Sequence, residues 1–355
     1  MKRAFLFAAI AAQAYAAAPV LTELQPRGAE LGRPFKLTVT GRNLAEGVRI
    51  ASSFPASFSL LTSQSPGMMM APGRSVSFLV EPKADAAPGV YPIRVETPAG
   101  ISNILFFTAG TFPEIAEEES QPYARPHSND SVETAEAIRS TPVTVNGTLR
   151  GPERDFYRIS AKAGERRVFE VEARRCGSAI DPVLRILDGA GKQLARSDDS
   201  AGTGLDTRLE VVFPAEGYYY VEVHDARFSK QAQNFYRLKM GSYQYADGIF
   251  PLGGRHGERV AVTMFGAHLA SPVKITADLR AAPEKQSLTE VRLPGSPALP
   301  FLFAVSDLPE VIAPLAGAAP LPGVINGRLE KPGAIDRYRF QVEPGSSLLF
   351  ELEAR

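Results

Sequence analysis

The chain has 355 residues with 39 basic and 39 acidic side chains, so its formal net charge at pH 7 is zero. This balance gives no electrostatic reason to expect nucleic acid or an anionic membrane as a partner. The length allows roughly two or three domains, each able to bury its own core. Cys176 is the single cysteine, which excludes an intramolecular disulfide.

The N-terminus has the order of a secretory signal peptide, which we place at residues 1–18. Two basic residues precede a short apolar run, and Ala14-Tyr15-Ala16 fits an A-x-A cleavage site. A membrane-spanning helix takes about 20 apolar residues, and Gln13 interrupts this run too early. We therefore expect an exported protein, secreted or held in the periplasm or at the cell surface, that begins near Ala17 and has no membrane-spanning segment.

From Pro19 on, apolar and polar residues alternate over short runs that turn residues separate. Phe35, Leu37 and Val39, for example, alternate with polar residues before a turn at Gly41. A period of two predicts β-strands, and almost no segment has helical periodicity. The predicted fold class is all-β, built as tandem β-sandwiches. We expect sandwiches or strand-rich blocks over 19–110, 127–241 and 242–313, a linker over 111–126, and an incomplete block over 314–355.

An internal repeat supports this division. Residues 155–174 recur at 336–355 with almost half of the aligned positions identical, and residues 25–44 resemble residues 250–269. Two strands cannot bury a core by themselves, so the second copy of the 127–241 block is incomplete. We therefore expect Arg355 to be a boundary within a longer chain.

The two copies also predict which faces are buried. Tyr157 aligns with Tyr338, and the apolar positions that follow stay apolar, so this face is expected to point inward. Phe156 aligns with Arg337, which a buried site would not accept without a partner. This substitution predicts that Phe156 faces outward.

The residues of the second block match a known family. Asn146-Gly147, the run "DFYRISAKAGERRVFEVEAR" and the run "PAEGYYYVEVHD" resemble bacterial pre-peptidase C-terminal (PPC) domains. The blocks at 19–110 and 242–313 resemble the immunoglobulin-like (IPT/TIG-like) modules that precede such domains. The second of these is shorter and is expected to lack strands. The resemblance implies a jelly-roll-like sandwich without catalytic residues, which accompanies secreted hydrolases, chiefly peptidases.

The same resemblance implies a candidate calcium site. Calcium takes six to eight oxygen ligands. The positions of this chain that match the ligands of calcium-binding PPC domains are Asn129, Asp130, Glu153 and Asp155. His127 replaces the family's usual glutamate, and Glu117 to Glu119 lie too far upstream to count as substitutes. The alternative is that Asn129 to Ser131 form a turn or a helix cap, and that Asp155 hydrogen-bonds backbone.

Catalysis finds little support in the sequence. The four histidines are scattered, and neither an HExxH pair nor a G-x-S-x-G elbow is present. Alternation exposes Tyr218 and Tyr220, which we consider as candidate ligand contacts. Cross-strand packing explains these tyrosines equally well.

We therefore expect a non-catalytic protein, not an enzyme, that serves extracellular binding or spacing. Its partner would be an extracellular protein or polysaccharide polymer, or a catalytic domain of the same protein. The alternative is the non-catalytic accessory region of a secreted hydrolase, a peptidase, whose catalytic domain lies outside this sequence.

Overall fold

The computed structural model describes residues 17–44, 47–61, 75–118, 128–228, 234–283 and 286–354. The predicted signal peptide falls outside these residues except for its last two positions. The described chain is almost entirely β-structure, with a single helical turn, η1 (Arg174–Cys176), which confirms the all-β prediction. None of its helices is long and apolar enough to cross a membrane. The chain divides into two compact units, residues 1–109 and 110–355.

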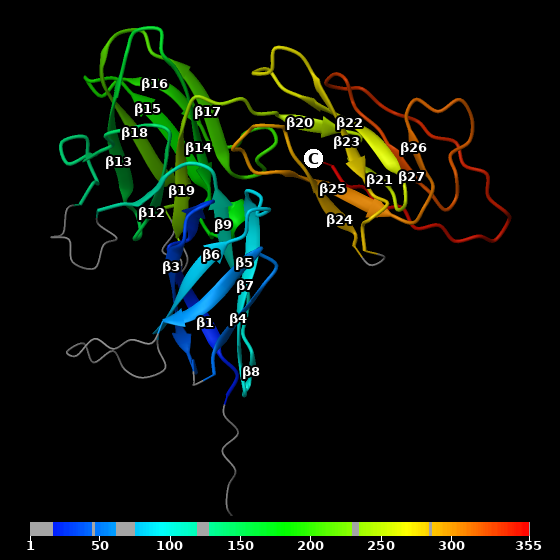
Figure 1. The fold of residues 1–355 in the computed structure, drawn as a ribbon. Coiled ribbons are helices and arrows are strands. Elements are labelled where there is room, and N and C mark those ends of the chain that lie inside the picture. The colour runs from blue at the N-terminus through cyan, green and yellow to red at the C-terminus, as the bar shows by residue number, and fades with distance from the viewer. Residues whose placement is uncertain are drawn as a thin grey trace, which may run out of the picture. The chain divides into compact units, whose positions relative to one another are not determined.

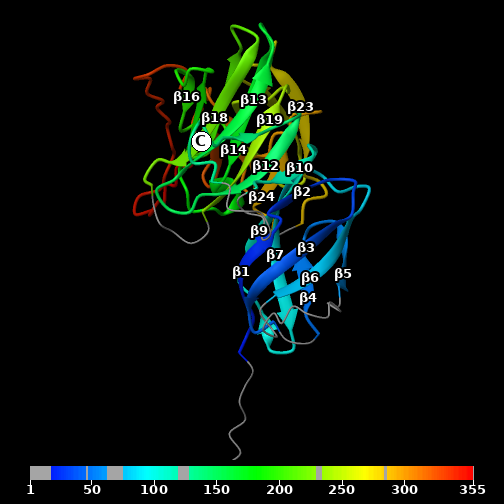
Figure 2. The same cartoon turned by 90° about the vertical axis from the view of Figure 1, so that its left-hand side faces the viewer.

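The first unit is a β-sandwich (Figures 1 and 2). Its strands alternate buried apolar and exposed polar residues, and Leu37, Val39, Val80 and Phe107 lie in the core. One sheet has the order β1 (Val20–Gln25), β3 (Phe35–Arg42), β6 (Ser75–Pro82) and β5 (Ala56–Leu61). The other has the order β2 (Gly28–Glu30), β9 (Leu105–Gly110), β7 (Gly89–Thr97) and β4 (Arg49–Ser52), and β8 (Gly100–Ile101) pairs with β7.

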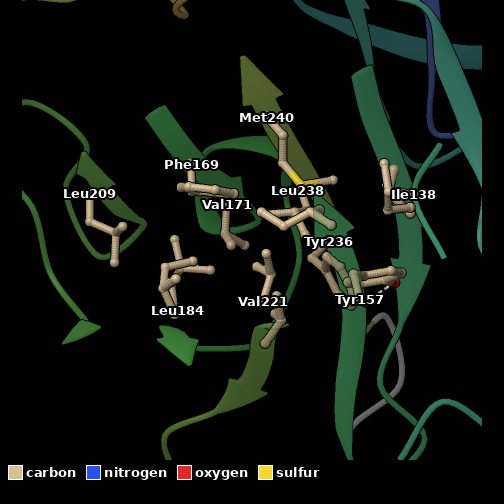
Figure 3. Close-up of a cluster of buried hydrophobic side chains, with 14 of the residues drawn as sticks. Ile138, Tyr157, Phe169, Val171, Leu184, Leu209, Val221, Tyr236, Leu238 and Met240 are labelled. Atoms are coloured by element: carbon tan, nitrogen blue, oxygen red, sulfur yellow. Dashed lines mark hydrogen bonds between the residues drawn. The ribbon is translucent and has the colours of Figure 1, made fainter. Parts of the chain in front are cut away.

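The second unit begins with a larger sandwich of two five-stranded sheets. One sheet has the order β10 (Glu114–Ala116), β12 (Val143–Thr148), β19 (Phe235–Gly241), β14 (Arg166–Glu172) and β17 (Thr207–Val212). The other has the order β11 (Glu136–Ala137), β13 (Arg154–Ala161), β18 (Gly217–Asp225), β15 (Pro182–Leu187) and β16 (Gln193–Ser197). Figure 3 shows Phe169 and Leu238 from the first sheet among Leu184 and Val221 from the second.

A third, smaller sandwich follows in the second unit. Its sheets have the orders β20 (Gly248–Phe250), β22 (Arg259–Phe265), β23 (Val273–Asp278) and β21 (Gly253–Arg255), β25 (Phe301–Ser306), β24 (Leu288–Val291). Val262, Met264 and Phe303 are the fully buried centre of its core. Beyond it, β26 (Glu310–Ile312) and β27 (Val324–Asn326) pair in parallel.

A tyrosine after a tight turn fastens a strand in each of the two larger sandwiches. The Tyr91 hydroxyl donates a hydrogen bond to the Ala87 carbonyl at 2.6 Å, and Tyr219 donates to the Ala215 carbonyl at 2.7 Å. Both tyrosines follow the pattern Ala-x-Gly-x-Tyr, in which the turn brings the carbonyl back toward the ring. The bond therefore ties the turn to the strand that starts there.

The structure differs from the sequence prediction at Phe156, which is 7% exposed rather than outward-facing in water. Residues 117–142 join β10 to β12 in the first copy, whereas residues 313–323 join β26 to β27 in the second. The longer connection carries Asn129, whose carbonyl accepts a hydrogen bond from Phe156 N at 2.8 Å. The shorter connection has no counterpart of this segment, so Arg337 in the second copy is exposed.

For two further segments, the structure adds detail to the organisation that the sequence predicted. Strand β10 lies within the predicted linker and pairs in parallel with β12. Residues 336–354, which align with β13 and β14, contribute one isolated bridge at Phe340 and leave Leu349 93% exposed. In the first copy these strands pair with β18 and β19, whose sequence occurs once in the chain.

Candidate functional site

The predicted calcium ligands fall into two groups in the structure. Asn129 and Asp155 are each 2% exposed, and the hydrogen bond from Phe156 N to the Asn129 carbonyl sets the Asn129 segment against the start of β13. Asp130 is exposed and accepts a hydrogen bond from the Ser128 hydroxyl. Glu153 accepts one from the backbone N–H of Arg150. The structure thus brings Asn129 and Asp155 together and gives the other two local partners.

Asp155 belongs to a buried polar cluster that contains two tyrosines and a second carboxylate. The Tyr236 hydroxyl donates to Asp155 Oδ2 at 2.5 Å, and the Tyr157 and Tyr236 hydroxyls lie 2.5 Å apart. Tyr157 also donates to Glu117 Oε2 at 3.3 Å, while Glu117 Oε1 accepts from Thr148 N at 2.8 Å. Figure 3 shows Tyr157 and Tyr236 side by side at the edge of the apolar core.

Glu117 completes this cluster, although it lies far upstream in the sequence and was not expected to take part. Strand β10 pairs in parallel with β12, and Glu117 N continues the ladder by donating to the Asn146 carbonyl at 3.0 Å. The signal that could have identified Glu117 is the Pro-Glu segment that precedes both copies, "PEI" in the first and "PEV" in the second, because it leads into β10 in one and β26 in the other.

Gly147 in β12 makes room for the cluster. A Cβ at this position would lie 2.3 Å from Tyr236 Cζ and 2.8 Å from Glu117 Oε2, which no side chain tolerates. Gly327 in the second copy faces the Tyr338 hydroxyl in the same way, at 2.6 Å from its Cβ position. The glycine of the Asn-Gly pair is therefore required by the close approach of a tyrosine, independently of any metal.

Burial governs the electrostatics of the two phenols. Desolvation raises the pKa of Tyr236 well above its ordinary value, and the charge of Asp155 adds to the effect. The pKa of Tyr157 is raised for the same reason, with Glu117 and Asp155 adding to it. Both hydroxyls therefore stay protonated and serve as hydrogen-bond donors to the carboxylates.

We tested whether these residues fit calcium. The buried amide of Asn129 has no hydrogen-bond partner among the described residues, so its oxygen is available to a ligand. Two residues supply fewer oxygens than calcium takes. In the described ranges, no three His, Cys, Asp or Glu side chains are grouped so as to hold a metal ion. The four-residue site stays a prediction.

A second polar region covers the outer face of the β12-β19-β14-β17 sheet. Side chains that alternate with the core residues carry charges of both signs and are nonetheless buried, namely Glu170, Glu172, Arg208, Arg237 and Lys239. Glu172 binds both Arg237 and Lys239, and Arg237 also binds Glu114. Each buried charge is thus neutralised by neighbours, as its desolvation requires.

Glu170 lies at the centre of this charged face. Its carboxylate accepts from Arg175 Nη2 at 2.7 Å and from the Tyr243 hydroxyl at 3.0 Å. Burial alone would raise the pKa of Glu170, but the charges of Lys239, Arg175 and Arg208 outweigh it and hold the pKa well below its ordinary value. Glu170 therefore stays ionised in the folded protein.

Later segments of the second unit lie over the same face. Lys239 Nζ donates to the Pro297 carbonyl at 2.9 Å, and Arg208 Nη2 donates to the Ala246 carbonyl at 3.1 Å. The Arg208 guanidinium also stacks 3.8 Å from the Tyr245 ring centre. The network therefore holds these segments against the larger sandwich. Most of the polar atoms of the network take part in such structural contacts.

The predicted ligand contacts Tyr218 and Tyr220 lie on β18. Tyr218 is 62% exposed, with the Arg158 guanidinium 5.1 Å from its ring centre, and Tyr220 is half-buried. Tyr219 between them is buried against Phe213. Tyr218 therefore offers the larger aromatic surface to solvent, and ligand contact by these residues stays a prediction.

Comparison with known proteins finds a curated relative that matches part of the chain. No protein-family model matches it. It is 34% identical over 98 residues to a "Probable subtilase-type serine protease" of Deinococcus radiodurans, a match that covers 27% of this chain and 13% of that protein. The chain thus spans much less than two thirds of this curated relative.

Matches among solved structures include two from bacterial enzymes. The match to the pre-peptidase C-terminal domain of Bacillus anthracis collagenase covers 30% of this chain and 94% of that domain, with 16% identity and a TM-score of 0.24. The match to the secreted serine protease VesC of Vibrio cholerae covers 60% of this chain and 48% of the VesC chain, with 11% identity and a TM-score of 0.23.

Proposed function

We propose that this chain is a non-catalytic binding or spacing region that accompanies a secreted peptidase. The observation that carries the proposal is the 34% identity over 98 residues to a subtilase-type serine protease. The buried carboxylates agree with a structural role, because arginine, lysine and tyrosine partners hold them in place. A catalytic centre would instead aim such groups at a substrate.

Within this role, we propose Tyr218 as a contact to an extracellular protein polymer. Its ring is 62% exposed, and Arg158 holds one face of it by a cation–π contact. Exposed aromatic side chains beside arginine are frequent energetic centres of binding surfaces. Tyr220 is half-buried and would contribute the edge of the same surface.

Sedimentation with insoluble collagen fibrils tests the proposal. The purified chain should co-sediment with the fibrils, and Tyr218→Ala should weaken binding by about tenfold, the loss expected for a residue that contributes about 1.4 kcal/mol. Leu205→Ala is the matched control, since Leu205 is also exposed on the same unit. Binding to a polysaccharide but not to collagen would overturn the assignment to a protein polymer, and binding that Tyr218→Ala leaves unchanged would overturn the assigned contact.

A further inference from the structure

The small sandwich of residues 248–306 has the strand arrangement of the first unit with two strands missing. The sheet β20-β22-β23 corresponds to β1-β3-β6, and β21-β25-β24 corresponds to β2-β9-β7. Residues 43–74 separate β3 from β6 and contain β4 and β5, whereas only residues 266–272 separate β22 from β23. Strands β4 and β5 therefore have no counterpart in the small sandwich.

In the first unit these two strands close one side of the sandwich. Strand β5 pairs with β6 at the edge of one sheet, and β4 pairs with β7 at the edge of the other. The turn between them carries Phe54, which is 4% exposed. Its ring lies 4.8 Å from the Tyr91 ring and 5.6 Å from the Phe107 ring. The segment β4-turn-β5 thus covers both sheet edges and inserts an aromatic ring between the sheets.

The same side of the small sandwich is open. Strands β23 and β24 each pair with a single neighbour in the described part of the chain. A groove of about 280 Å³ runs between their edges. Its lining is mixed: Ile275, Ala277, Leu279 and Val291 are apolar, and the polar or charged residues are Thr276, Asp278, Thr289, Glu290 and Arg292.

The registers of the two sandwiches locate the missing aromatic ring in this groove. Phe107 in β9 is opposite Tyr91 in β7, and the buried Phe303 in β25 is opposite Thr289 in β24. Thr289 therefore stands where the first unit has Tyr91, whose ring packs against Phe54. Thr289 is smaller than a tyrosine, and it lines the groove.

The edges offer backbone hydrogen-bonding groups beside the apolar residues of the groove. An unpaired strand edge presents a row of N–H and C=O groups to any extended segment that can pair with it. Along β23, Val273, Ile275 and Ala277 face the core side while Lys274 and Thr276 are exposed, so the register of an added strand is fixed by this alternation.

We propose that this groove binds an extended segment of a partner protein that has the chemistry of β4 and β5. The model for the occupant is the chain's own filling of the equivalent place. In β5, Ala56 and Phe58 pack on the core, and Ser57 and Ser59 alternate with them. The partner segment would accordingly alternate apolar with small polar residues and carry an aromatic side chain at a turn.

A labelled peptide with the sequence of residues 49–61, RIASSFPASFSLL, is the probe. The purified chain should bind it saturably and should not bind a scrambled peptide. Ile275→Lys and Thr289→Lys place a charged side chain against the edges of the groove, where an added strand would pack, and should each weaken binding at least about tenfold. Leu302→Lys, on the exposed face of β25, is the matched control and should leave binding unchanged. Circular dichroism confirms that each variant is folded.

Several outcomes would overturn the proposal. The first is failure of the unaltered chain to bind the peptide. The second is binding of the scrambled peptide as tight as that of the original peptide. The third is binding by both lysine variants as tight as that by the unaltered chain. The lysine variants also distinguish the groove from strand exchange in the first unit, which they would not affect. Self-association of the chain that Ile275→Lys abolishes would show that a second copy fills the groove, and would overturn its assignment to a different protein.

Discussion

The Tyr236 hydroxyl and the Asp155 carboxylate form a hydrogen bond of 2.5 Å that joins the two sheets of the larger sandwich. Tyr236 lies on β19 and Asp155 on β13, which belong to different sheets. Both residues are buried, so the bond operates where water cannot replace it. The pair is a polar fastener at the edge of an otherwise apolar core.

Removing the hydroxyl should therefore destabilise this sandwich measurably. We expect Tyr236→Phe to lower the free energy of unfolding by about 2 kcal/mol, because the buried carboxylate loses a donor. Urea denaturation followed by circular dichroism measures the change. Tyr218→Phe is the control, since this exposed hydroxyl should contribute less than about 0.5 kcal/mol. Equal stability of both variants and the unaltered chain would show that the bond contributes nothing.

Calcium titration tests the site that the sequence predicted. We expect the melting temperature to be the same in calcium and in chelator, because Asp155 already accepts from Tyr236, and Asp130 and Glu153 have local donors. A ligand at about 100 times its Kd would stabilise the fold by about 2.7 kcal/mol. A calcium-dependent rise in melting temperature that Asp155→Ala abolishes would establish the predicted site and contradict this expectation.

Glu170 should make stability depend on pH. The folded-state pKa of Glu170 lies below the ordinary 4.5, so its stabilisation is complete above that value and is lost as the pH falls further. We expect Glu170→Gln to cost about 3 kcal/mol at neutral pH, because buried cations lose their counter-charge. The cost should shrink between about pH 5 and about pH 3, as measured by urea denaturation.

The exposed Glu216→Gln is the control for this measurement. It should alter neither the stability at neutral pH nor the pH dependence. A Glu170→Gln cost that is constant across the acidic range would mean that Glu170 is not held ionised by its neighbours.

The two tyrosines that follow tight turns should contribute similarly in their separate sandwiches. We expect Tyr91→Phe and Tyr219→Phe each to lower the free energy of unfolding by about 1 kcal/mol, the net contribution of one hydrogen bond. Because they lie in different compact units, each loss should appear only in the unfolding of its own unit, and the double variant should show both losses. A double variant no less stable than either single variant would contradict independent fasteners.

Alternation predicted the all-β class and the inward face of β13, because a strand repeats every two residues whatever lies beyond it. Tyr157, Ile159 and Ala161 are buried as that pattern requires. The alignment of the two copies misplaced Phe156, since burial of the other face depends on a connection that the second copy lacks. A comparison of repeats is informative only where both copies have the same neighbours.

The buried charges were invisible to sequence reasoning for a related reason. Glu170, Arg237 and Lys239 alternate with core residues and resemble the solvated face of a sandwich. Their burial results from segments that follow in the chain, such as the one that carries Pro297. Glu117 was missed because its place is set by a parallel strand pairing, which neither alternation nor local motifs encode.

We propose that this chain assists a peptidase without being one, and hydrolysis of fluorescein-labelled casein is the decisive test of this proposal. The purified chain should release fluorescein at the rate of buffer alone, in an assay where a subtilisin-type protease gives a strong signal. Release that rises in proportion to the concentration of the chain, and that a serine-protease inhibitor abolishes, would contradict the claim.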